Sequence, residues 1–191
     1  MEEVNLNHIV VIGGSAGSLE VLLQLMSAMA PDFHHPIVLV LHRRATDDNL
    51  LENLFAAKCA FPVVSVEDKT PLRPGCLFIA PSDYHLLFER DATLSLDMSA
   101  KINFSRPSID VSFESVADAW GAKVTAILLS GANSDGTRGL KAIQEKGGLA
   151  VVQDPATAAM PTMPQSAIEA LSPDGVATPL QLIEIIKKGT I

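Results

Sequence analysis

Short apolar runs alternate along the chain with longer stretches in which apolar residues recur every three or four positions. The short runs are rich in β-branched residues and predict buried strands, whereas the longer stretches have the spacing of amphipathic helices. The expected strands are residues 8–12, 37–41, 63–66, 77–80, 124–129 and 149–152. The expected helices are residues 18–29, 47–57, 108–120, 137–146, 164–170 and 180–187. This alternation predicts an α/β fold with one doubly wound, mostly parallel sheet that carries helices on both faces.

Two further segments, residues 85–89 and 93–96, are separated by Arg90-Asp91-Ala92 and predict a small β-hairpin appended to the sheet. Residues 97–107 show no period and are expected to form an exposed loop. The expected helix N-caps are Ser18, Asp47, Ser108 and Thr137, and the expected helix stops are Gly121 and Gly147. Because no repeat, linker or low-complexity tract interrupts the pattern, we expect residues 1–191 to form a single domain.

Composition narrows the class of protein. Hydrophobic residues make up 48% of the 191 residues and the mean hydropathy is +0.27, so a large core is expected. No apolar run is long enough to cross a bilayer and the N-terminus lacks the features of a secretory signal, so we expect a cytoplasmic protein without membrane insertion. Cys59 and Cys76 are too few for a disulfide framework and match no zinc spacing. The net charge of −8, from 14 basic and 22 acidic residues, disfavours a nucleic-acid partner.

Three polar residues each follow an expected strand. Ser15 comes after the first strand in Gly13-Gly14-Ser15-Ala16-Gly17, His42 follows the second strand, and Asp135 follows the strand at residues 124–129. The carboxyl ends of parallel strands meet at one edge of a sheet, where such folds bind ligands, so these side chains can converge. A serine activated by an imidazole that a carboxylate orients is the arrangement of nucleophilic acyl transfer. We therefore interpret the three residues as a candidate catalytic triad.

Each of these residues also has a purely structural explanation. Ser15 can end a tight turn, and His42 can be a solvent-exposed histidine that precedes two arginines. Asp135, which precedes Gly136, can be a turn residue or a helix cap. The glycine-rich turn at residues 13–18 also suggests a nucleotide site, but it fits neither the dinucleotide-binding nor the P-loop pattern. An anion bound at this turn stays open as an alternative.

Further short motifs extend the pattern over most of the chain. In order, they are Ile12-Gly13-Gly14-Ser15-Ala16-Gly17, Leu39-Val40-Leu41-His42, Ile79-Ala80-Pro81, His85, Arg106-Pro107-Ser108-Ile109-Asp110, Leu128-Leu129-Ser130-Gly131, Ser134-Asp135-Gly136, Gly139-Leu140, Gly147-Gly148, Gln153-Asp154-Pro155, Met163-Pro164 and Ala167-Ile168. Together they resemble the catalytic domain of the CheB-type protein-glutamate methylesterases of bacterial chemotaxis. The resemblance extends over residues 9–186.

The resemblance implies hydrolysis of γ-methyl esters on glutamyl residues of chemoreceptor-like helices with release of methanol, and deamidation of glutamines in some members. It implies Ser15 as the nucleophile, His42 as the general base and Asp135 as its orienting partner. It implies no metal and no organic cofactor, and a methylated chemoreceptor or a similar helical signalling protein as the partner. The oxyanion is expected at backbone amides of Ala16 and of the loop that contains Ala132 and Asn133.

Two features depart from the family pattern. Family members commonly carry threonine after the serine and a Gly-Met-Gly-like stretch before the aspartate, where this chain has Ala16 and Ala132-Asn133. Typical members also carry an N-terminal receiver domain, whereas only seven residues precede the first expected strand here. We therefore expect a catalytic domain without phosphorylation control in the same chain, which is either constitutively active or held in check by a separate regulator.

Several alternatives stay open at this point. The guanidinium of Arg106 can bind substrate carboxylates near the site, or it can pair with Asp110 or another local carboxylate and hold the loop. The changes at Ala16 and Ala132 also suit a non-catalytic module that binds methylated or amidated receptor helices. A third function is an esterase for a different protein or a small ester, because a fold and a triad do not set the substrate.

Overall fold

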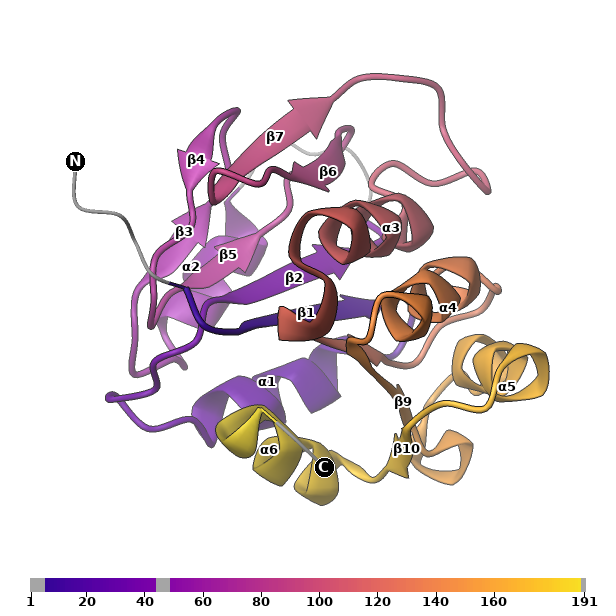
Figure 1. Cartoon of the computed structure of the whole chain (residues 1–191). Coiled ribbons are helices and arrows are strands. Elements are labelled where there is room, and N and C mark those ends of the chain that lie inside the picture. The colour runs from indigo at the N-terminus through magenta and orange to yellow at the C-terminus, as the bar shows by residue number, and fades with distance from the viewer. Residues whose placement is uncertain (1–5, 44–48, 190–191) are drawn as a thin grey trace.

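The computed structural model describes residues 6–43 and 49–189 and confirms the predicted fold class (Figure 1). Within this part of the chain, a seven-stranded sheet has the order β10-β9-β8-β1-β2-β5-β3, and its strand pairs are parallel. Its strands are β1 (Ile9–Gly14), β2 (Ile37–Leu41), β3 (Val63–Ser65), β5 (Leu77–Ile79), β8 (Val124–Leu128), β9 (Leu149–Gln153) and β10 (Gly175–Ala177).

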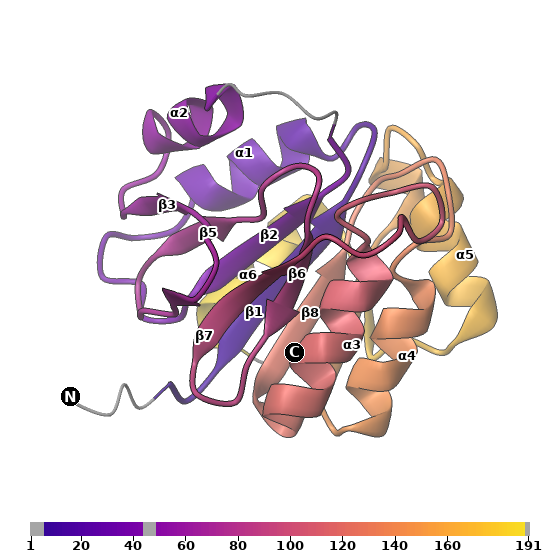
Figure 2. The same ribbon diagram turned by 90° about the horizontal axis from the view of Figure 1, so that it is seen from above.

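Helices cover both faces of this sheet, as Figure 2 shows. One face carries α1 (Leu19–Ser27), α2 (Leu50–Ala56) and α6 (Pro179–Lys188), and the other carries α3 (Ile109–Trp120), α4 (Thr137–Glu145) and α5 (Thr162–Ala170). Short 3-10 helices lie at Gly121–Lys123 and Pro155–Thr157. Alternate side chains of β1 pack into the two layers, with Val11 on the side of α3 and Ile12 on the side of α1. Both faces of the central strands are therefore buried, which explains their continuous apolar runs.

The appended hairpin is part of a slightly larger structure. Strands β6 (His85–Phe88) and β7 (Thr93–Asp97) form the predicted antiparallel pair, and β4 (Thr70–Pro71) adds to β7 to give a three-stranded sheet. This small sheet packs on the same side of the main sheet as α3. The sequence pattern predicted neither β4 nor β10, because Thr70–Pro71 and Gly175–Ala177 do not stand out as apolar runs, whereas the equally short β3 and β5 lie in such runs.

Two of the predicted helix N-caps are confirmed by position, and one, Thr137, was wrong. The serines at the starts of α1 and α3 do occupy N-cap positions, but neither hydroxyl caps its own helix. The Ser18 hydroxyl donates to the carbonyl of Ser15 at 2.7 Å, and the Ser108 hydroxyl donates to the carboxylate of Asp135 at 2.9 Å. The N-cap of α4 is Gly136 rather than Thr137, and the predicted cap Asp47 lies outside the described residues.

Both predicted helix stops are confirmed. Gly121 ends α3 as predicted, and Gly147 follows the last residues of α4 with a φ of +82°, which favours glycine. In the described ranges 6–43 and 49–189, no helix combines the length and the apolarity that a bilayer crossing needs.

Candidate active site

Ser15 lies in a tight turn between β1 and α1. Its N–H donates to the carbonyl of Ser130 at 2.9 Å, which ties the turn to the end of β8. Its own carbonyl accepts the N–H of Ser18 at 3.1 Å, so residues 15–18 form a β-turn whose third residue is Gly17. The φ of +78° at Gly17 fits a type II turn, which requires this backbone conformation at its third position. The turn fixes the backbone of Ser15 while its side chain stays partly exposed.

The buried side chain of Ser130 supports this turn by hydrogen bonding. Its hydroxyl donates to the carbonyl of Ala16 at 2.8 Å and accepts the N–H of Met160 at 2.9 Å. The N–H of Ser130 in turn donates to the side-chain oxygen of Gln153 at 3.0 Å. A Cβ atom on Gly17 would lie 2.9 Å from the Ser130 hydroxyl, so this approach requires glycine. Sequence reasoning missed the supporting role of Gln153, because its signal is only a polar residue at the end of a buried strand.

The structure brings His42 and Asp135 together. The Nε2 atom of His42 lies 2.7 Å from Oδ2 of Asp135, and the Asp135 side chain is fully buried. The N–H of His42 donates to the carbonyl of Gly14 at 3.2 Å, and Gly14 pairs with Leu41 in the parallel register of β1 and β2. Ser15 and His42 therefore follow adjacent strands at the same edge of the sheet. The parallel registers of β1 with β2 and β8 bring the carboxyl ends of these strands to one edge of the sheet, and the loop after β8 carries Asp135 to His42 there.

Asp135 is held by five hydrogen bonds on its two carboxylate oxygens. Oδ2 accepts from His42 and from the N–H of Ile109 at 2.8 Å. Oδ1 accepts from the Ser108 hydroxyl at 2.9 Å and from the N–H groups of Asp110 and Gly136, each at 3.1 Å. Two of these donors are the N–H groups of Ile109 and Asp110, the first residues of α3, which lack partners within the helix, and a third is the hydroxyl of its N-cap, Ser108. Asp135 therefore caps α3 from a different part of the chain.

These donors keep the carboxylate of Asp135 ionised. Burial by itself raises the pKa of this group, but the hydrogen bonds from His42 and from the Ile109 and Asp110 amides outweigh burial and hold the pKa at about 2. An ionised carboxylate can only accept hydrogen bonds, so Nε2 of His42 carries the proton that it shares with Asp135. Nδ1 is then the ring nitrogen with a free lone pair. It can take a proton from a neighbouring hydroxyl.

The hydrogen bonds formed by residues 6–43 and 49–189 do not include one between the Ser15 hydroxyl and His42. The strand register places Ser15 and His42 after neighbouring strands, but their side chains form no direct hydrogen bond. In enzymes without bound substrate such a catalytic hydrogen bond is often long.

Backbone amides near Ser15 are available for a developing negative charge. The N–H groups of Ala16, Ala132 and Asn133 donate to no group in the part of the chain that the structure describes. The neighbouring N–H of Gly131 is excluded because it donates to the carbonyl of Met160 at 3.0 Å. The side-chain oxygen of Asn133 accepts the N–H of Asp135 at 3.1 Å, so this side chain shapes the loop. Free amides of this kind can form an oxyanion hole.

Arg106 pairs with a local carboxylate, but its partner is Asp83 rather than Asp110. Its Nη2 and Nε atoms donate to Oδ1 of Asp83 at 2.8 and 3.2 Å. Its Nη1 donates to the carbonyls of Met98 and Ser99 at 2.8 and 2.7 Å. The hydrogen bond from Arg106 holds the pKa of Asp83 below its usual value. The guanidinium thus fixes the loop before α3, and its remaining N–H is all that it can offer a substrate.

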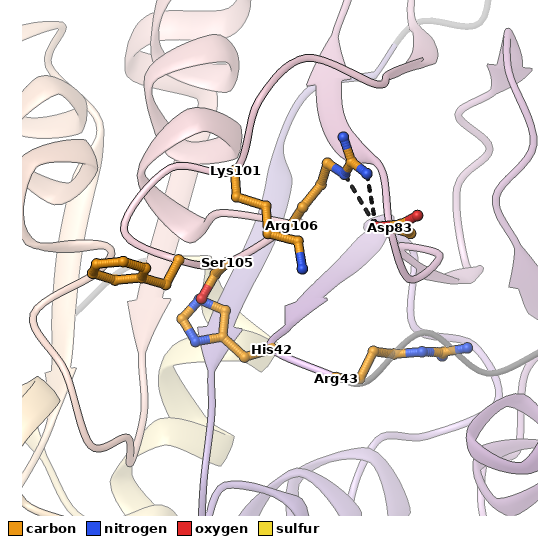
Figure 3. A pocket seen from close by; sticks show the side chains of 7 residues that line it. His42, Arg43, Asp83, Lys101, Ser105 and Arg106 are labelled. Atoms are coloured by element: carbon orange, nitrogen blue, oxygen red, sulfur yellow. Dashed lines mark hydrogen bonds and ion pairs between the residues drawn. The ribbon is translucent and has the colours of Figure 1, made fainter.

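An open cavity of about 440 Å³ lies beside His42 (Figure 3). Its lining residues come from the end of β2 and from the loops before β6 and after β7: His42, Arg43, Asp83, Lys101, Phe104, Ser105 and Arg106. A cavity of this size is within the range of ligand sites, which is about 300–1,000 Å³. It places a concave surface next to the imidazole.

Sequence reasoning gave no role to His85, a fully buried histidine behind the site. Nδ1 of His85 accepts the N–H of Ser108 at 3.1 Å, and its Nε2 lies 3.1 Å from the carbonyl of Ala100. An N–H only donates and a carbonyl only accepts, so this ring is neutral with its proton on Nε2. His85 therefore connects the start of α3, where Ser108 holds Asp135, to the loop that lines the cavity. Its sequence signal, a histidine at the start of a short strand, pointed to no such role.

Comparisons with known proteins show the family of this chain. The CheB methylesterase family matches residues 10–186. A Leptospira interrogans protein named for protein-glutamate methylesterase and protein-glutamine glutaminase activity is 42% identical over 176 residues, which cover 92% of this chain and 91% of that protein. A protein-glutamate methylesterase/protein-glutamine glutaminase of Maricaulis maris is 33% identical over 166 residues, which cover 85% of this chain and 41% of that protein.

The structure agrees with these sequence matches. The crystal structure of the Thermotoga maritima CheB methylesterase catalytic domain has a TM-score of 0.91 with this chain at 30% identity. The match covers 96% of this chain and 99% of the other. The sequence match, the similarity over nearly the whole fold and the paired histidine and aspartate at the sheet edge lead to one conclusion: the chain belongs to the CheB methylesterase family.

Proposed function

We propose that this chain hydrolyses γ-methyl esters of glutamyl side chains in a methylated chemoreceptor or a similar helical signalling protein, and releases methanol. The observation that carries the proposal is the hydrogen bond between the partly exposed His42 and the buried Asp135, beside Ser15, in a chain of this family. Relatives are named for both methylesterase and glutaminase activity. The same site therefore also suits deamidation of glutamine side chains.

In the first half of the reaction, the Ser15 hydroxyl attacks the carbonyl carbon of the ester and its proton moves to Nδ1 of His42. The carbonyl oxygen becomes an oxyanion, which the N–H groups of Ala16, Ala132 and Asn133 stabilise; this role is supported by their lack of an acceptor among the described residues. Asp135 stabilises the imidazolium through its hydrogen bond to Nε2. The bond to the methoxy group then breaks, the leaving oxygen takes the proton from His42, and methanol departs. A glutamyl ester of Ser15 remains.

In the second half, water attacks the glutamyl ester of Ser15 while His42 takes one of its protons. The bond to the Ser15 oxygen then breaks, and the proton returns to that oxygen. The products are a free glutamate side chain and the original serine. With a glutamine substrate the same steps release ammonia in place of methanol.

Methanol release from methylated chemoreceptor membranes tests this proposal. We expect release by the native chain and a loss of about 10⁴ or more with Ser15→Ala. Ser27→Ala, a change of an exposed serine on α1, is the matched control and should keep full activity. A Ser15→Ala variant that keeps most of the activity would exclude Ser15 as the nucleophile.

Covalent labelling gives a second measurement that does not depend on the receptor. A serine-directed phosphonate should label the native chain at Ser15 and should leave Ser15→Ala unlabelled. If the native chain releases no methanol and takes up no phosphonate, the serine is not an active nucleophile and a binding function replaces the proposed one.

A further inference from the structure

The loop between β7 and α3 presents apolar side chains to solvent next to the proposed active site. We call residues 98–105 the recognition loop. Phe104 is 99% exposed and Met98 is 62% exposed, although both are apolar. Phe104 also lines the cavity that contains His42. Exposed apolar side chains that gather beside a functional cavity are typical of a surface that another molecule covers.

The tip of the recognition loop is built to hold this exposed position. Ile102 and Ser105 exchange two backbone hydrogen bonds of 3.2 and 2.9 Å, which close the tip. The two residues between them, Asn103 and Phe104, have φ values of +49° and +62°. Residues other than glycine adopt this conformation at an energetic cost, and such strain is concentrated at functional sites. The loop thus keeps Phe104 in solvent at a cost in both burial and backbone conformation.

Among the described residues, the cations of this cavity differ in their partners: Lys101 has no ion pair, although its charge, after the hydrogen bond and charge of Arg106, helps to lower the pKa of Asp83. Arg43 pairs with Glu52 at 2.9 Å, and Arg106 pairs with Asp83 at 2.8 Å. The amine of Lys101 forms no hydrogen bond or ion pair with residues 6–43 or 49–189, and Figure 3 shows its side chain extending from the recognition loop into the cavity. In a chain of net charge −8, this places an available positive charge beside His42. Its complement is a carboxylate on the bound molecule.

We propose that the recognition loop selects glutamyl esters whose neighbour on the substrate helix is a free carboxylate: Lys101 binds that carboxylate, and Phe104 packs on an apolar side chain of the same helix. This inference rests on the proposed function. The reaction itself converts esters into carboxylates, so the substrate helix carries both groups. Residues three or four positions apart lie about 5–6 Å from one another on a helix face. A carboxylate one turn from the ester can therefore reach Lys101 while the ester faces His42.

Esters on one helix face are then hydrolysed in a preferred order. Hydrolysis at one position creates the carboxylate that Lys101 binds when the next ester, one helical turn away, enters the site. Each hydrolysis then promotes the next along the same helix face. An isolated ester flanked by amides is the poorer substrate.

Two helical peptides of about 20 residues test this selection. Each carries one glutamyl methyl ester, and the position four residues away is glutamate in one peptide and glutamine in the other. We expect the native chain to show a kcat/KM about fivefold higher for the glutamate peptide at low salt, as an exposed ion pair gives. The preference should largely disappear at about 0.5 M salt, because exposed charges are screened.

Two lysine variants separate local from general electrostatics. Lys101→Glu should abolish or reverse the preference for the glutamate peptide. Lys123→Glu, at an exposed lysine of the short helix before β8, changes the net charge equally and should keep the preference. The ratio between the two peptides is measured within one variant, so a loss of folded protein does not alter it.

Phe104 is tested in the same assay. Phe104→Ala should raise KM for both peptides, by about tenfold, and leave their ratio unchanged. The control Leu180→Ala removes an apolar side chain that is 69% exposed on α6 and should have no effect.

Three results overturn the inference. They are an equal kcat/KM of the native chain for both peptides, a preference that survives Lys101→Glu, and a Phe104→Ala variant that behaves as the native chain does. A native chain that releases methanol from neither peptide contradicts the proposed function instead, and the inference falls with it.

Discussion

Asp110 and Asp135 link the starts of α3 and α4: Asp110 is in α3 and accepts an N–H of α4, and Asp135 precedes α4 and accepts an N–H of α3. Asp135 precedes α4 and accepts the N–H of Asp110, in the first turn of α3, at 3.1 Å. Asp110 accepts the N–H of Gly139, in the first turn of α4, at 2.8 Å. The two helix starts are thereby joined, and the position of the proposed triad carboxylate depends on both helices. Four predictions follow from this arrangement and its surroundings.

Replacement of Asp135 tests the orienting role directly. Asp135→Asn retains the size of the side chain but places an amide N–H against donors of His42 and α3. We expect kcat/KM for methanol release to fall by about 10⁴, because the imidazole loses the partner that selects its tautomer. Asp174→Asn changes a carboxylate that accepts the N–H of Ala150, away from the site, and should retain activity. A loss of tenfold or less in Asp135→Asn would contradict the assignment.

Ser108 is expected to act through Asp135. In Ser108→Ala, Oδ1 of Asp135 loses a hydrogen bond of 2.9 Å, and we expect activity to fall by about tenfold, the value of one hydrogen bond to a charged group. Ser112→Ala removes a buried hydroxyl one turn later that donates to the carbonyl of Leu86. We expect Ser112→Ala to lower the free energy of unfolding by about 1 kcal/mol, a loss similar to that of Ser108→Ala, without a loss of activity.

The activities and stabilities of Ser108→Ala and Ser112→Ala are compared to test whether Ser108 acts through Asp135. Urea unfolding measures the stability of each variant, and methanol release measures its activity. Equal activities at equal stabilities would show that the Ser108 hydroxyl supports only the fold.

Asp110 should make the stability of the fold depend on pH. Burial, and to a lesser extent the nearby charge of Asp135, raise the pKa of Asp110 to about 6, above its ordinary value of 3.8. Between these values the folded chain binds the proton more tightly than the unfolded chain, so this group favours folding at low pH and its contribution is lost as pH rises through 6. Asp110→Asn removes this dependence and keeps an acceptor for the N–H of Gly139.

The expected result is a gain in stability of Asp110→Asn relative to the native chain that grows from pH 4 to pH 7 and then levels off. Urea unfolding at each pH measures it. Asp135, with a pKa of about 2, loses its contribution only below pH 3.8 and so lies outside this window. A difference between the two proteins that does not change with pH would contradict the raised pKa.

Gly136 is expected to be required at the junction between Asp135 and α4. Its φ is +90°, and a Cβ atom there would lie 2.6 Å from Leu128 and 2.8 Å from Ile109. Gly147→Ala provides the matched control, since its φ is +82° but the nearest atom to its Cβ is 3.5 Å away. We expect Gly147→Ala to cost about 1 kcal/mol from backbone strain alone, and Gly136→Ala to cost about 3 kcal/mol from strain and overpacking. Thermal or urea unfolding compares them, and equal losses would mean that the loop relaxes around the added methyl group.

Much of the fold could be read from local patterns. The runs that became β1, β2 and β8 are apolar on both faces, and the polar residue after each of them is Ser15, His42 and, after a glycine-bounded loop, Asp135. Parallel strands place such residues at one edge whatever the details of the loops. The short strands β4 and β10 were missed because they are stabilised by pairing with neighbouring strands rather than by a pattern of their own.

The partners of the polar side chains could not be read in this way. Arg106 and Asp83 are 23 residues apart, and Ser108 and Asp135 are 27 residues apart. A serine before a helix predicts a cap for that helix, yet the Ser108 hydroxyl donates to the carboxylate that caps α3 in its place.

The sequence by itself thus determined the succession of strands and helices along the chain, the fold class and the three polar residues that follow the strands. It could do so because periodicity and turn chemistry act over a few neighbouring residues. Only the tertiary structure decided which donors surround Asp135, which carboxylate holds Arg106 and which amides near Ser15 find no acceptor among the described residues. Those choices depend on the distances between helices and loops far apart in sequence, where a hydrogen bond forms or fails within a few tenths of an ångström.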